Sequence, residues 1–313
     1  MLTFLMRRVA AVVPVLVVVG VFVFLVLRLS PGDPAAAVLG DNATPENIAA
    51  VRQQLGLNDS LPAQFARWAK HVAVGDLGVS YYMKAPVTTL VSQRVGPTIS
   101  LAVVTLILTV IIAVPLGVLA AWRHGGWLDR FLMGTSVLGF SVPGFVIGYL
   151  LIWLFALHLR WFPVQGYTSI DKGLWEWLSH LVMPAVALSV VYTALIARVT
   201  RAAVAEVLTE DFIRTARAKG ISEYRVLARH ALTNSAIPIV TVIGNGIALL
   251  IGGVVVTETV FAIPGMGQLT VDAVVSRDYP VIQGVTLLFS ITYVFVNLLV
   301  DLSYTLFDPR VRY

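Results

Sequence analysis

Near-continuous apolar runs of about 20 residues constrain this sequence more than any other feature. A run of that length crosses roughly 30 Å of hydrocarbon as an α-helix. Six such runs are present, at 9–27, 98–121, 131–157, 181–199, 237–256 and 281–307. Barrel strands would alternate apolar and polar residues in pieces of about 10 residues instead. Only 12% of the residues are charged, against about a quarter in a soluble domain, so we expect an all-α, polytopic membrane protein with six transmembrane helices.

The placement of Lys and Arg predicts how these helices cross the membrane. Basic residues gather in alternate connections: Arg7, Arg8, Arg123, Arg130, seven residues between Arg198 and Arg229, and then Arg310 and Arg312. The opposite short connections hold only Arg160, Lys172 and Arg277. Since short cytoplasmic loops carry the excess of Lys and Arg, we expect both termini in the cytoplasm. The net charge of +5 then reflects this bias and does not indicate nucleic-acid binding.

The spans divide the chain into four parts. We expect an N-terminal transmembrane helix (1–29), an external segment (30–96), a transmembrane core (97–307) and a cytoplasmic tail (308–313). A cleavable signal peptide is disfavoured, because the first run exceeds the usual 7–15 residues and prolines occupy the cleavage region. Thr44-Pro45 and Ser60-Leu61-Pro62 predict two short helices in the external segment. These helices either form a structural cap or dock a soluble partner.

Residue patterns for covalent chemistry are missing from the sequence. No two of the five histidines are spaced i, i+4, there is no phosphate-binding loop of the Gly-x-x-x-x-Gly-Lys-Ser/Thr type, and cysteine is absent. Ser141 lacks the Gly-x-Ser-x-Gly elbow of a nucleophile. These absences exclude a zinc-protease motif, ATP binding through such a loop, a thiolate metal site and a cysteine nucleophile.

Polar residues within the spans are few and suggest a passage. Glu258, Arg198 and Asp301 lie near span ends, and an unpaired buried charge is costly, so Arg198 and Asp301 form a candidate ion pair. Acids and histidines near the midplane, which a secondary transporter would carry, are absent, and so is the repeated filter or ring of charge that a channel would need. Candidate pathway residues are Ser141, Pro143, Thr241, Asn245 and Asn297.

One polar segment, residues 209–231, interrupts the apolar sequence after the fourth span. It predicts two short helices broken at Gly220, a residue type favoured just past a helix C-terminus. Thr209 and Ser222 are the expected helix caps. One face of the first helix is expected to carry Phe212, Thr215, Ala216 and Lys219. The small Thr and Ala side chains would let this face enter a groove on a partner. The alternative is a basic helix that rests on anionic lipid.

Several motifs in this sequence resemble those of a known family. RTARAKG (214–220) followed by RHALTNSAIP (229–238) looks like the coupling loop of permease subunits of type I ABC importers. The resemblance is to the B-type permease of the dipeptide/oligopeptide group. The general family motif begins Glu-Ala-Ala, where this chain has Arg214-Thr215-Ala216. Further similar segments are LSPGDP (29–34), GDLGVSY (75–81), TETVFAIPGMGQL (257–269), SRDYPVIQG (276–284) and DPRVRY (308–313).

The resemblance implies a mechanism and a set of partners. A soluble extracytoplasmic binding protein would deliver a peptide, and this chain would form half of the translocation pathway with a homologous second permease in the bacterial inner membrane. Two ATPase subunits, which carry ATP and Mg, would bind the coupling helices. This chain would then be a transport subunit without its own ATP site, metal or cofactor, and not an enzyme. The coupling residues would be Asp211, Phe212, Arg214, Thr215, Ala216, Arg217, Ala218, Lys219 and Gly220. Nickel, glutathione or another peptide-like solute is the alternative cargo.

Overall fold

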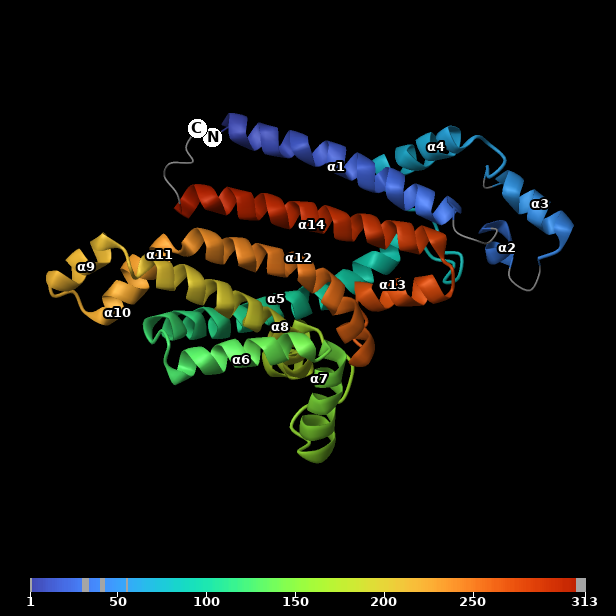
Figure 1. Cartoon of the computed structure of the whole chain (residues 1–313). Coiled ribbons are helices and arrows are strands. Elements are labelled where there is room, and N and C mark those ends of the chain that lie inside the picture. Colours follow the sequence, from blue (N-terminus) through green and yellow to red (C-terminus); the bar gives the residue numbers. More distant parts are fainter. Residues whose placement is uncertain (1, 30–33, 40–42, 55, 308–313) are drawn as a thin grey trace. The chain divides into compact units, whose positions relative to one another are not determined.

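Helices account for nearly all of the fold (Figure 1). The computed structural model describes residues 2–29, 34–39, 43–54 and 56–307. Within these ranges no strand forms, apart from an isolated antiparallel bridge between Val79 and Pro86. The expected all-α fold is confirmed. The expected tail, 308–313, lies outside the described residues.

Four described helices are long and apolar enough to cross a membrane. They are α5 (Val87–Trp122), α8 (Leu174–Val207), α12 (Ala236–Val260) and α14 (Tyr279–Phe307). The helix α1 (Leu2–Leu29) covers the first expected span. With 36 residues, α5 is longer than the roughly 20 residues that a bilayer requires. It begins within the segment that we expected to be external and continues through Gly96 and Pro97 without a break.

The third expected span, 131–157, is not one continuous α-helix. It is divided into α6 (Trp127–Ser141), α7 (Gly144–Leu151) and a π-helical turn at Ile152–His158. The break falls at Pro143, whose ψ of 137° is that of an extended residue. Proline has no backbone N–H and disfavours helical geometry at the residue before it. The chain therefore changes direction at this point.

Among the described residues, one compact unit contains 97–263 and 295–307. Its apolar core includes Leu101, Leu181, Leu188 and Phe261, contributed by α5, α8 and the end of α12. Glycines permit close helix contacts: a Cβ at Gly117 of α5 would lie 2.6 Å from the carbonyl oxygen of α8 residue Ala197. Small residues commonly allow such approach in membrane proteins. Neighbouring helices in this unit are therefore packed with little space between their backbones.

A polar contact also joins α5 and α12 in this unit. The Glu258 side chain is fully buried, and the Thr98 hydroxyl donates a hydrogen bond of 2.6 Å to its Oε1 atom. A buried carboxylate is costly unless hydrogen-bonded, so Thr98 contributes to holding Glu258 inside the helix bundle.

A second compact unit contains residues 2–96 and 264–294. It includes α2 (Pro34–Leu39), α3 (Pro45–Gln54), α4 (Leu61–Ala73) and α13 (Met266–Val275). Phe24 of α1 packs against Phe65 and Trp68 of α4, with ring centroids 5.4 and 5.7 Å away. The helix start predicted at Thr44-Pro45 is confirmed, because α3 begins at Pro45 and the Thr44 hydroxyl accepts the Asn47 N–H at 3.3 Å.

A buried carboxylate connects two sequence motifs of the second unit. Asp278, only 2% exposed, accepts hydrogen bonds from the Ser80 hydroxyl and from the backbone N–H groups of Tyr81 at 3.1 Å and Tyr82 at 3.2 Å. The segments 75–81 and 276–284 are thereby held together, although nearly 200 residues separate them in the sequence.

Candidate functional site

The polar segment (209–231) folds as expected into short helices separated by a turn. The first is α9 (Asp211–Ala218), and after Gly220 come α10 (Glu223–Arg225), a π-helical turn (Val226–Ala231) and α11 (Leu232–Asn234). The predicted cap at Thr209 is wrong, because Glu210 stands at the cap position of α9 and the Thr209 hydroxyl donates back to the Glu206 carbonyl at 2.7 Å. Ser222 does stand at the cap position of α10, as predicted, but its side chain makes no cap hydrogen bond.

One side of α9 is buried within the chain itself. Ile213 and Ala216 form a small apolar cluster with Val226, and Val207 and Leu208 from the end of α8 pack against it. Ala216 is only 7% exposed. The predicted contact face is therefore wrong at Ala216, because this residue fixes α9 to the end of α8 and is not free to meet a partner.

The opposite side of α9 is open. Phe212 remains 44% exposed, and Asp211, Arg214, Thr215, Arg217, Ala218 and Lys219 are also exposed. An exposed ion pair joins Arg214 and Asp211 at 3.0 Å, which contributes little to stability. Tyr224, which the sequence analysis did not single out, is 80% exposed. An aromatic residue within a polar, basic segment is the sequence signal that could have pointed to Tyr224. The exposed residues of α9 and α10 thus include two aromatic rings and several positive charges.

The turn at Gly220 has the geometry that terminates a helix with a left-handed residue. Gly220 has φ +76°, its N–H donates to the Arg217 carbonyl at 2.9 Å, and the Ile221 N–H donates to the Ala216 carbonyl at 3.2 Å. These two bonds define the Schellman motif. Nothing lies within 4 Å of where a Cβ would be. A side chain at this position would therefore cost backbone strain and would not cause a clash.

The far end of the polar segment is tied to α8 and α12. Ala231 is fully buried against Val204 of α8 and Ile239 of α12. The Ser235 hydroxyl lies 2.9 Å from the Ala231 carbonyl oxygen and 3.2 Å from that of Ala203 in α8. Both ends of the polar segment thus rest on the two long helices that it connects.

The candidate pathway residues are spread over three helices. Ser141 and Pro143 are exposed at the break between α6 and α7, and Asn245 is exposed on α12. Asn297 is half-buried on α14, and Thr241 donates its hydroxyl to the Ile237 carbonyl at 2.7 Å. An amide exposed in the middle of an apolar helix is costly in lipid, so Asn245 is well suited to a polar surface.

The candidate ion pair draws on two long helices. Arg198 is exposed on α8 and Asp301 is half-buried on α14. The pairing of these two residues stays a prediction.

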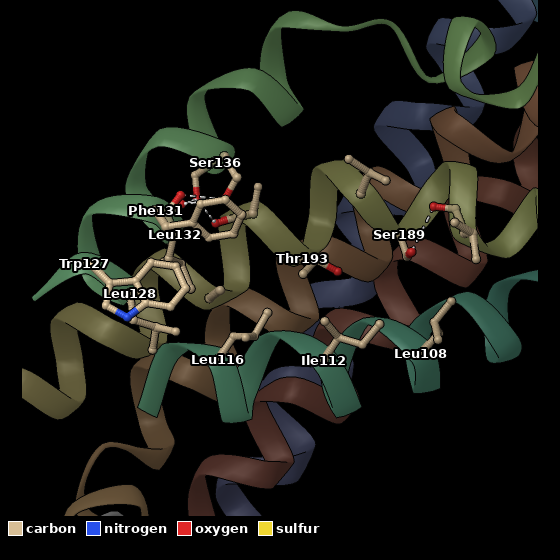
Figure 2. Close-up of a pocket in the computed structure, with 15 residues that line it drawn as sticks. Leu108, Ile112, Leu116, Trp127, Leu128, Phe131, Leu132, Ser136, Ser189 and Thr193 are labelled. Atoms are coloured by element: carbon tan, nitrogen blue, oxygen red, sulfur yellow. Dashed lines mark hydrogen bonds between the residues drawn. The ribbon is translucent and has the colours of Figure 1, made fainter. Parts of the chain in front are cut away.

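An apolar groove of about 410 Å³ lies between α5, α6 and α8 (Figure 2). Its walls include Ile112, Phe131 and Leu132, with Ser189 and Thr193 as sparse polar members. None of the candidate pathway residues lines it. Among the described residues, no group of three or more His, Cys, Asp or Glu side chains could hold a metal ion.

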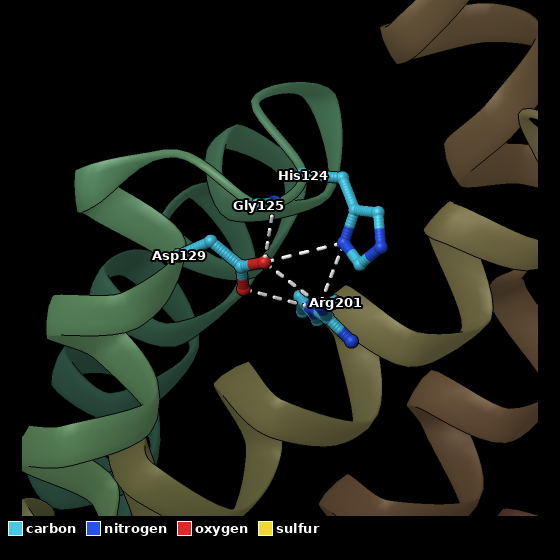
Figure 3. A network of polar contacts seen from close by, with 4 residues as sticks. All are labelled: His124, Gly125, Asp129 and Arg201. Atoms are coloured by element: carbon cyan, nitrogen blue, oxygen red, sulfur yellow. Dashed lines mark hydrogen bonds and ion pairs between the residues drawn. The ribbon is translucent and has the colours of Figure 1, made fainter.

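A buried ion pair that the sequence analysis missed joins α6 to α8 (Figure 3). Asp129 accepts two hydrogen bonds from Arg201, at 2.9 Å from Nε and 2.8 Å from Nη2. The Gly125 N–H adds a third at 2.9 Å, and His124 Nδ1 lies 3.2 Å from the carboxylate. The hydrogen bonds from Arg201 lower the pKa of Asp129 from 3.8 to about 2 against the opposing effect of burial, with further help from Gly125. This carboxylate is therefore ionised at neutral pH.

Family models match nearly the whole chain. Residues 113–313 match the family described as "Binding-protein-dependent transport system inner membrane component", and residues 1–102 match the model of its N-terminal component. The chain belongs to this family. As a member, it is a multi-pass protein of the bacterial inner membrane, consistent with its long apolar helices.

Relatives in this family align over their full length. The "Probable peptide ABC transporter permease protein y4tP" of Sinorhizobium fredii is 55% identical over 99% of both chains. The "Glutathione transport system permease protein GsiC" of Salmonella paratyphi A is 41% identical over 100% of both. A solved structure of the MetNI methionine ABC transporter in an inward-facing conformation matches with a TM-score of 0.60 at 19% identity, covering 71% of this chain and 97% of that one. That last likeness shows the shared fold alone.

Proposed function

We propose that this chain is the permease subunit of an ATP-driven peptide importer and forms half of its translocation pathway. A homologous second permease completes the pathway, two ATPase subunits supply ATP hydrolysis with Mg, and an extracytoplasmic binding protein delivers the solute. The observation that carries the proposal is the polar segment, which offers an exposed aromatic and basic side while its buried side is fixed to the end of α8. The full-length family match supports the same role.

In this proposal the ATPases contact the exposed residues of α9 and α10. Phe212 and Tyr224 supply exposed apolar area, and Arg214 and Lys219 supply charge. Aromatic and Arg residues are the usual anchors of protein interfaces. Because Ile213 and Ala216 hold α9 against α8, a displacement of α9 would move the end of that long helix. A basic helix on lipid would need neither the fixed turn nor the buried cluster.

The proposed topology places the polar segment in the cytoplasm and residues 30–96 outside. The chain has no cysteine, so a single cysteine reports one position cleanly. A cysteine introduced by Ser222→Cys should react with an impermeant thiol reagent only after the membrane is opened. Its labelling from outside intact cells would contradict the orientation.

Peptides are the proposed cargo because relatives aligned over the whole chain carry that description. Glutathione, itself a small peptide, is the second candidate, supported by the relative at 41% identity. Nickel is the third and has no comparable support among these relatives. The proposal is tested by uptake of a labelled dipeptide in a strain deleted for this permease and complemented with it. Competition by unlabelled oligopeptide, glutathione or nickel ions then separates the candidates.

The candidate pathway residues and the four-part division of the chain belong to the same proposal. Asn245 is its best-supported pathway residue, because an exposed amide on α12 avoids the cost of facing lipid if it lines a polar passage shared with the second permease. Ser141 and Pro143 lie where the helix is broken, and breaks of this kind are tolerated where they line a cavity.

A further inference from the structure

The Asp129–Arg201 pair lies on the route between the polar segment and α6. Arg201 stands on α8 ahead of Val207 and Leu208, the residues that pack against α9. Asp129 stands in the first turn of α6, whose other end leads to the break at Pro143. The pair therefore connects the helix that carries α9 to the helix that precedes the break.

The geometry of the Asp129–Arg201 pair resists sliding of α6 along α8. The Arg201 guanidinium donates two hydrogen bonds to the Asp129 carboxylate (Figure 3), and such fork-like pairing fixes direction as well as distance. Asp129 is only 4% exposed, so separating the charges would leave one of them buried and unpaired. The Gly125 hydrogen bond also fixes the turn between α5 and α6 to the same carboxylate.

The rest of the α6–α8 contact is mostly apolar. A Cβ at Gly139 of α6 would lie 3.5 Å from the Ala194 Cβ of α8, and the apolar groove occupies part of the space between these helices (Figure 2). The hydrogen bond from the Ser136 hydroxyl to the Ala194 carbonyl is long, at 3.5 Å, so it opposes movement of these helices far less than the Asp129–Arg201 pair does. The Asp129–Arg201 pair, at one end of the α6–α8 contact, would then decide whether α6 moves together with α8.

We propose that Asp129 and Arg201 are positioning residues that make α6 move together with α8 when the polar segment is displaced. This inference rests on the proposed coupling role of that segment. The alternative is that the pair only stabilises the folded chain. The two readings differ in what neutralising the pair would do to an assembled complex.

The test uses the complete importer in lipid nanodiscs, with cysteines absent from the partner subunits and spin labels on this chain at Met133→Cys in α6 and Ala202→Cys in α8. Both positions are exposed. Pulsed electron paramagnetic resonance measures the label separation without nucleotide and in a vanadate-trapped state. We expect one unchanged separation in the otherwise wild-type chain, and a separation that shifts or broadens on trapping in Asp129→Asn.

Transport provides the second readout. In Asp129→Asn we expect peptide uptake per ATP hydrolysed to fall about tenfold, within the usual range of coupling between sites. Arg201→Lys, which keeps the charge but loses the fork, should show a smaller fall and serves if Asp129→Asn assembles poorly. Asp59→Asn is the matched control, since it removes an exposed Asp–Arg pair with Arg67 in the other compact unit.

Two results would contradict the proposal that Asp129 and Arg201 make α6 move with α8. One is an unchanged label separation in both Asp129→Asn and Arg201→Lys, and the other is uptake that falls only in proportion to the amount of assembled complex. A separate measurement tests the coupling role of the polar segment. If that role is wrong, peptide uptake would be insensitive to substitutions at Gly220, whatever the label separation shows.

Discussion

Arg217 and Glu223 form an ion pair of 2.8 Å that spans the turn at Gly220. Their side chains are 40% and 43% exposed, and exposed pairs are usually worth 0.2–1 kcal/mol. We therefore expect Glu223→Gln to lower the free energy of unfolding by less than about 1 kcal/mol, measured by thermal unfolding of the purified permease. Arg217→Gln is the matched control and should behave alike. A much larger loss from either change would mean that the turn depends on this pair.

Thr215 and Ala216 are neighbours in α9, but Thr215 is exposed and Ala216 is buried, so we expect tryptophan at the two positions to have different effects. Thr215→Trp adds bulk on the open side, so we expect normal insertion and reduced co-purification of the ATPase subunits. Ala216→Trp would overfill the cluster with Ile213 and Val226, and overpacking typically costs 1–3 kcal/mol. It should lower the unfolding temperature as well. Equal unfolding temperatures for the two variants would contradict the buried position of Ala216.

Arg198 and Asp301 remain a predicted pair between α8 and α14. We expect each single reversal, Arg198→Asp or Asp301→Arg, to reduce the amount of folded permease in the membrane, because each places like charges together. The double reversal should restore assembly at least in part. If it assembles no better than either single change, the two residues do not pair.

Asp129 predicts a pH dependence with a definite sign. Its pKa falls from 3.8 to about 2 on folding, mainly through the Arg201 hydrogen bonds. A depressed carboxyl pKa contributes stability above its unfolded value and loses it as the pH falls toward the folded value. The difference in unfolding temperature between the wild type and Asp129→Asn should be present above about pH 5 and shrink below pH 4. A gap that does not shrink as the pH falls below 4 would contradict this assignment.

The helical fold and the turn at Gly220 could be predicted from the sequence because both are local. The length and composition of each apolar run predict a helix that crosses lipid. A glycine between two short polar helices predicts the left-handed residue that ends the first helix. The cap predicted at Thr209 is wrong, since the chain enters α9 one residue later, at Glu210, whereas Ser222 stands at the predicted cap position of α10 without a side-chain hydrogen bond.

Tertiary contacts explain what the sequence could not show. Asp129 and Arg201 are 72 residues apart, and each resembles an ordinary membrane-flanking charge until α6 and α8 are packed together. Ala216 is periodic with Phe212 along α9, yet the end of α8 covers it. The break at Pro143 is complete because the residue adopts an extended ψ, whereas proline in α5 and α8 leaves those helices continuous.

The most direct test of the coupling role compares two glycines of the same backbone class. Gly220 has φ +76° and Gly75 has φ +83°, and neither has an atom within 4 Å of a would-be Cβ. Valine at either position therefore strains the backbone by a similar amount, about 1–2 kcal/mol or more. The measurement is peptide uptake together with co-purification of the ATPase subunits, for permeases present at equal amounts in the membrane. We predict that Gly220→Val loses both while Gly75→Val keeps both. Wild-type uptake by Gly220→Val with the ATPases still bound would contradict the account.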